Sequence, residues 1–68
     1  MNSEVMTKHE AAEFLKIPVR TVEYLIATNQ IPFSRLGKRA VRFYRARLIE
    51  WIREREGVEL RYNKSATN

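Results

Sequence analysis

The sequence lacks several residue types on which small folds and enzymes often depend. Its 68 residues include no cysteine, no aspartate and one histidine, His9. Without cysteine, neither disulfides nor thiolate metal sites can stabilise so short a chain. Nor do the remaining residues supply a set for nucleophilic or acid–base catalysis. We therefore expect a protein that is not an enzyme and that needs neither a metal nor another cofactor.

Long apolar runs are also missing. No stretch approaches the ~20 apolar residues that span a bilayer, and the first residues lack the basic start and apolar run of a secretory signal. A chain of this length forms one domain and buries only ~60% of the surface that its unfolded form exposes, which leaves little room for a catalytic cleft. We expect a small cytoplasmic binding module with no membrane partner.

Negative charge is absent from the middle of the chain. All eight acids are glutamates, none lies between Glu23 and Glu50, and the formal net charge is +5. Cations on a hairpin edge also protect it from pairing with another chain, but that role accounts for only one or two of them. A run without a compensating acid favours contact with phosphates. The cations in this interval are Arg35, Lys38, Arg39, Arg42, Arg45 and Arg47.

Glycine is scarce, and Gly37 separates two short apolar and β-branched runs, residues 33–36 and 40–43. A short turn containing glycine between such runs predicts a β-hairpin. Period-two alternation places Val41 and Phe43 on one face, and we expect Leu36 to be their apolar partner on the facing strand. Two strands alone are marginally stable in water, so this face must pack on helices.

Two short helices are predicted before the hairpin. Thr7 and Glu10 match a capping box, which begins a helix over residues 8–16. A second helix over residues 19–28 follows Pro18, because proline suits a first helical turn and disfavours the helix before it. Two helices joined by so short a turn have the dimensions of a helix-turn-helix. The residues expected to face inward are Ala11, Leu15, Val22, Leu25 and Ile26.

A third helix is predicted over residues 45–56. Leu48, Trp51 and Ile52 share one face of it, and Gly57 is expected at its C-cap. We interpret Trp51 as a core residue rather than a surface for base stacking. The sequence therefore predicts a mainly α-helical domain with a small β-hairpin, an α+β fold, in the order helix, helix, strand, strand, helix.

The limits of the domain follow from where the periodicity begins and ends. Residues 1–5 are expected to form a flexible arm, residues 6–57 the folded domain, and residues 58–68 a tail that is largely disordered in isolation. Asn29 is expected to end the second helix by adopting a left-handed backbone conformation.

The outer face of the second helix carries residue types that reach base edges in a major groove. Arg20 suits guanine and Thr21 suits a thymine methyl group, and Tyr24 lies beside them. Glu23 has three interpretations: it accepts from a cytosine amine, tethers Arg20, or keeps phosphates away. We predict DNA contacts from this helix by Arg20, Thr21 and Tyr24, and from the hairpin and its flank by Arg35, Lys38, Arg39, Arg42 and Arg45.

The ordered segments TKHEAAEFLKIPVRTVEYLI, IPFSRLGKRAVRF and LIEWI together resemble the small winged helix-turn-helix proteins of the excisionase and AlpA-type phage regulator group, relatives of the MerR DNA-binding domain. The resemblance implies that the second helix enters the major groove and that the hairpin, as a wing, lies along the backbone or in the adjacent minor groove. Lys16 and Pro18 stand where such proteins usually have Gly and Ser, and Tyr44 replaces a Pro or polar residue.

The resemblance implies a sequence-specific double-stranded DNA-binding protein. Excisionases bend DNA near the end of a mobile element and direct an integrase, a tyrosine recombinase, toward excision, whereas AlpA-type members regulate transcription through the same surface. We expect an excisionase of the bacterial nucleoid whose partners are DNA, an integrase and further copies of itself on adjacent sites. In this hypothesis the tail residues Val58, Leu60 and Tyr62 contact an integrase or a neighbouring protomer. A protein-interaction module, such as an antitoxin-like adaptor, and an RNA-binding protein are the alternatives.

Overall fold

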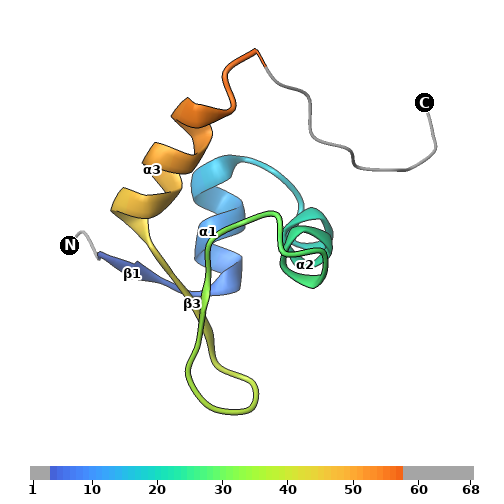
Figure 1. Ribbon diagram of the computed structural model, residues 1–68. Coiled ribbons are helices and arrows are strands. Elements are labelled where there is room, and N and C mark those ends of the chain that lie inside the picture. Colours follow the sequence, from blue (N-terminus) through green and yellow to red (C-terminus); the bar gives the residue numbers. More distant parts are fainter. Residues whose placement is uncertain (1–3, 58–68) are drawn as a thin grey trace.

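The structure, a computed structural model, describes residues 4–57. The chain forms three helices and a small sheet, and Figure 1 shows a hairpin loop that projects away from the helices. The α+β class and the order of the predicted elements are confirmed, with one further strand at the start. The predicted tail and the first three residues lie outside the described residues. The elements are β1 (Val5–Met6), α1 (Lys8–Leu15), α2 (Val19–Ala27), β2 (Ser34–Arg35), β3 (Val41–Tyr44) and α3 (Arg45–Glu54).

The predicted capping box begins α1. The hydroxyl of Thr7 accepts a hydrogen bond from the backbone N–H of Glu10 at 3.2 Å, and the Glu10 carboxylate accepts one from the N–H of Thr7 at 2.9 Å. The helix ends at Leu15, and Lys16 takes a left-handed conformation with φ 58°. This sharp stop turns the chain toward Pro18, the N-cap of α2.

The end of α2 also matches its prediction, because Asn29 has φ 54° and turns the chain toward the hairpin. The N–H of Gln30 then bonds to the carbonyl of Leu25 at 2.8 Å. Small side chains let the two helices approach, since Ala11 and Ala12 of α1 are buried. The buried core consists of Met6, Ala11, Ala12, Val22, Leu25, Ile31, Phe43 and Leu48.

The sheet has the order β1-β3-β2, with both pairings antiparallel. Val5 pairs with Tyr44 and Met6 with Phe43. The expectation that Val5 belongs to a flexible arm is therefore wrong. A strand of two residues is too short to show an alternating pattern, and it is formed by pairing with β3, a contact distant in sequence.

Leu36 does not lie on the core face of the hairpin, as the sequence led us to expect. The register pairs Ser34 with Arg42 and Arg35 with Val41. Facing residues of antiparallel strands share a face, and successive residues alternate, so Leu36 lies on the outer face with Arg42. Its side chain is 60% exposed. Phe33, packed against the core, takes the expected place.

Two predictions for α3 are also wrong. The helix ends at Glu54 with Arg55 as its C-cap, and Gly57, with φ 80°, lies beyond it. Ile52 is 43% exposed, whereas Leu48 is buried and Trp51 packs against the core.

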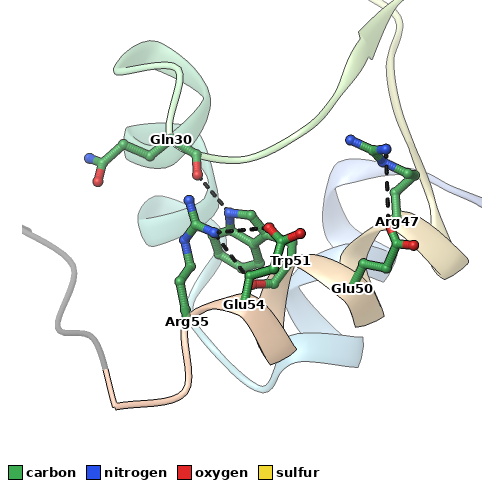
Figure 2. Close-up of polar contacts among 6 residues, drawn as sticks. All are labelled: Gln30, Arg47, Glu50, Trp51, Glu54 and Arg55. Carbon is green, nitrogen blue, oxygen red and sulfur yellow. Dashed lines mark hydrogen bonds and ion pairs between the residues drawn. The ribbon is translucent and has the colours of Figure 1, made fainter.

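Trp51 packs against the core as predicted. Its indole N–H donates a hydrogen bond to the carbonyl of Gln30 at 2.8 Å, which ties α3 to the segment that follows α2 (Figure 2). The Arg55 guanidinium lies 5.0 Å from the centre of the indole ring. Trp51 therefore holds together two elements that flank the hairpin.

Candidate nucleic-acid interface

The tip of the hairpin concentrates exposed positive charge. The N–H of Leu36 bonds to the carbonyl of Ala40 at 2.7 Å and closes a short loop. Gly37 has φ 97°, a left-handed conformation in which glycine carries no steric penalty. Lys38 and Arg39 follow it and are exposed. Figure 1 shows this loop, in yellow-green, extending away from the helices, so both cations can reach a partner beyond the body of the protein.

The two arginines of the hairpin strands lie on opposite faces. Arg35 shares the face of Val41, and its guanidinium lies 5.5 Å from the centre of the Phe33 ring. Arg42 lies on the outer face, half-buried, and donates a hydrogen bond to the carbonyl of Val41 at 2.8 Å. The predicted cations of the hairpin therefore lie on both of its faces and at its tip, and not along one side.

The predicted contact residues of α2 differ in exposure. Arg20 is exposed, whereas Thr21 and Tyr24 are half-buried at the margins of the same surface. The buried face of the helix is formed by Val22 and Leu25. Of the three predicted contact residues in α2, Arg20 is thus the most exposed.

Glu23 forms an ion pair, but its partner is Lys8 of α1 at 2.9 Å. The interpretation of Glu23 as a tether for Arg20 is not what the structure shows. This pair has no local sequence signal, because Lys8 and Glu23 become neighbours only when α1 packs across α2.

Arg45, the first residue of α3, is exposed and turned toward α1. Its guanidinium lies 5.3 Å from the centre of the Phe14 ring, and its backbone N–H bonds to the carbonyl of Glu4 at 2.9 Å. The first turn of α3 contains no acid. Arg47 reaches Glu50 at 3.9 Å, a contact between two exposed side chains (Figure 2).

Thr28 to Phe33 connect α2 directly to the hairpin, so these two elements are consecutive along the chain (Figure 1). The structure brings Lys8 to Glu23 and places Lys38 and Arg39 together at the hairpin tip. That Arg20 and Lys38 contact one duplex together stays a prediction.

A concave region lies between α3 and the segment that follows α2. A cavity of about 280 Å³ is lined by Gln30, Trp51, Glu54 and Arg55 among others (Figure 2). Its Arg55 and Glu54 side chains approach to 3.8 Å. The charges there are mixed, whereas those of the hairpin are of one sign.

No helix within residues 4–57 is long and apolar enough to cross a membrane. The same residues contain no group of three or more His, Cys, Asp or Glu side chains arranged to hold a metal ion.

Residues 5–56 match a family model described as a helix-turn-helix domain. The match begins at β1 and extends past the end of α3, so it covers the helices and the hairpin together. Neither a curated protein nor a solved structure matches the chain.

Proposed function

The chain belongs to the helix-turn-helix domain family, which includes AlpA- and excisionase-type proteins, and on this premise we propose that it is a non-enzymatic excisionase. It is a small DNA-binding helix-turn-helix protein. In the proposal it recognises a specific duplex sequence near the end of a mobile element, bends the DNA there and directs a tyrosine recombinase toward excision.

The proposed docking uses two elements. A major groove about 12 Å wide admits one α-helix, and α2 presents Arg20 on its exposed surface. The hairpin carries cations on both faces and at its tip. This arrangement suits a hairpin that lies in a groove, between the phosphate backbones of the two DNA strands, better than one that contacts a single backbone. The wing is therefore proposed to enter a minor groove, with Arg35 and Arg42 directed to opposite walls.

The single observation that carries DNA binding is the uncompensated charge of the hairpin. Lys38 and Arg39 are exposed at its tip, and no acid occurs between Glu23 and Glu50. Cations placed without acidic partners bind phosphates and release their counterions, which favours association with a duplex.

The excisionase role needs protein contacts as well as DNA. The outer face of the sheet exposes three large apolar side chains: Val5 at 43%, Leu36 at 60% and Tyr44 at 57%. One helix and one wing read few base pairs, so several copies on adjacent sites would raise selectivity. In the proposal the end of this face away from the hairpin tip, where Val5 pairs with Tyr44, contacts a neighbouring copy or the recombinase.

The test uses the full chain and the DNA that flanks its own gene. Footprinting should reveal a few protected sites and binding should bend the DNA, because an excisionase reshapes a defined segment. With a tyrosine recombinase and an integrated element, adding the protein should raise the yield of excised circles. Equal affinity for every duplex would contradict the proposal.

An AlpA-type transcription regulator is the second candidate, favoured by membership of the same family. It would use the same α2 and hairpin surface, so DNA binding alone does not separate the two roles. A change in promoter activity with no change in excision would favour the regulator. A stable complex with another protein and no DNA binding at low salt would instead favour an adaptor.

A further inference from the structure

An ion pair joins α1 to α2 at the surface. The Lys8 ammonium nitrogen lies 2.9 Å from Oε2 of Glu23. Lys8 is the first residue of α1, and Glu23 lies in the middle of α2. Both side chains remain in contact with solvent, with 34% and 51% of their surfaces exposed. The helix proposed to enter the major groove therefore carries an acidic side chain that forms an ion pair within the protein.

Glu23 lies on the same exposed side of α2 as Arg20 and Ala27. Their spacing places them along one side of a helix, opposite the buried Val22 and Leu25. Glu23 is the one acid in α2. An unpaired carboxylate here would be repelled by the phosphates of a duplex, and Lys8 cancels its charge.

Holding the two helices together is a weak explanation for the pair. The contact between them is already made by buried Ala11, Ala12, Val22 and Leu25, and exposed ion pairs contribute little to stability. A better explanation is that the ion pair positions the Glu23 carboxylate. Lys8 engages Oε2 and thereby fixes the carboxylate, which leaves Oε1 as a second acceptor.

We propose that Glu23 reads a cytosine in the major groove and that Lys8 is its positioning residue. The exocyclic amine of cytosine is a hydrogen-bond donor on that edge, and a glutamate oxygen is a matching acceptor. Oε1 accepts this bond, while Lys8 holds Oε2 and neutralises the carboxylate. This inference rests on the proposed DNA-binding function and adds a base preference to it.

The experiment selects preferred duplexes from a random library with the full chain and its variants. Glu23→Met keeps the length of the side chain but removes both oxygens, so preference for cytosine at one position should fall about 5- to 20-fold. Lys8→Met should weaken binding to all duplexes, because Glu23 is then charged and unpaired near phosphates. It should also reduce the preference for cytosine, because the carboxylate is no longer held in position. Lys8→Arg should restore binding.

The double variant Lys8→Met/Glu23→Met separates neutralisation from direct phosphate contact by Lys8. It should bind duplexes as well as Glu23→Met does, without the cytosine preference. Glu13→Met, the same change at an exposed position of α1, is the matched control and should leave the preferred sequence unchanged.

Two results would overturn the inference while leaving the proposed function intact. The first is an identical preferred sequence for the parent protein and Glu23→Met. The second is a double variant that binds as weakly as Lys8→Met, which would mean that Lys8 contacts a phosphate itself. Failure of the parent protein to enrich any sequence would instead overturn the proposed function, and this inference with it.

Discussion

Residues of the same chemical type have different surroundings in this domain. Arg20, Lys38 and Arg39 are exposed and point away from the core, whereas Arg42 is half-buried and donates a hydrogen bond to the carbonyl of Val41. Arg45 lies over the ring of Phe14. Charge alone therefore does not rank these residues as DNA contacts. Arg20 lies on α2, whereas Lys38 and Arg39 lie at the tip of the hairpin, so we predict that they contribute to DNA binding in different ways.

Arg20→Ala and Lys38→Ala should separate base reading from phosphate contact. Losing Arg20 should cost about 1–3 kcal/mol on the preferred duplex and relax preference at one base pair, because an arginine at a guanine edge is replaced by a methyl group. Losing Lys38 should weaken binding to all sequences about equally. Fluorescence anisotropy with the preferred duplex and a scrambled duplex measures both effects.

Equal losses on both duplexes for Arg20→Ala would contradict the assignment of Arg20 to base reading. Arg53→Ala provides a control, because Arg53 is an exposed arginine in the last turn of α3. It should change neither affinity nor preference.

Leu48→Ala and Ile52→Ala should have unequal effects on stability. Leu48 is fully buried, so truncating it leaves a cavity and should lower the free energy of unfolding by about 2–5 kcal/mol. Ile52 is 43% exposed, and its truncation should cost less than about 1 kcal/mol. Urea unfolding followed by circular dichroism measures both. Similar losses at the two positions would place Ile52 in the core, where the helical periodicity alone had put it.

At the scale of elements, the sequence predicted the start of α1, the end of α2 and the hairpin turn, because residues close together in the chain determine them. Thr7 and Glu10 fix the start of α1, Asn29 ends α2, and Gly37 allows the hairpin turn. Contacts distant in sequence determine the rest. Val5 enters the sheet only through Tyr44, and the face occupied by Leu36 follows from a register that the turn residues did not specify.

Some features of the candidate site were likewise predictable from the sequence, and others depend on contacts between residues distant in the chain. The basic hairpin was visible in the sequence because its cations are close together in the chain. The partition of Arg35 and Arg42 between two faces depends on strand register. The pairing of Lys8 with Glu23 depends on how α1 packs across α2. Neither arrangement has a local sequence signal.

The turn between α1 and α2 yields a prediction about stability. Lys16 has φ 58°, a conformation that costs a residue with a Cβ about 1–2 kcal/mol, while glycine adopts it freely but loses more entropy on folding. Lys16→Gly should therefore raise the free energy of unfolding by about 0.5–1 kcal/mol. Thermal and urea unfolding measure the gain.

Lys16→Ala is the matched control for this change, because it removes the same charge but keeps the Cβ. It should change stability by no more than about 0.5 kcal/mol. An equal gain from alanine would assign the effect to charge and contradict the argument from backbone conformation.

At the scale of the whole molecule, positive charge is concentrated on one projecting element. The described part of the chain has acids up to Glu23 in α2 and again from Glu50 in α3, but none from residue 24 to residue 49. This asymmetry orients the hairpin toward a polyanion and leaves the exposed Val5 and Tyr44, on the outer face away from the hairpin tip, available for a second contact. It also predicts how binding responds to salt.

Affinity for a duplex should fall steeply as salt rises. If the hairpin and its flank neutralise about four or five phosphates, the logarithm of the binding constant should fall against the logarithm of salt concentration with a slope of about −4. Arg39→Ala should reduce the magnitude of this slope by about one. Titrations of one duplex across a salt series test both values. A slope near zero would mean that phosphates contribute little.

The central claim is that α2 and the hairpin contact one duplex together. The most direct test is ¹⁵N nuclear magnetic resonance of the full chain, titrated with its preferred duplex, in which amide shifts report the contact surface. We predict that the largest shifts fall in α2 around Arg20 and in the hairpin around Lys38, with small shifts at Glu50 and Glu54 of α3. Large shifts confined to α3, with α2 and the hairpin unchanged, would contradict this account.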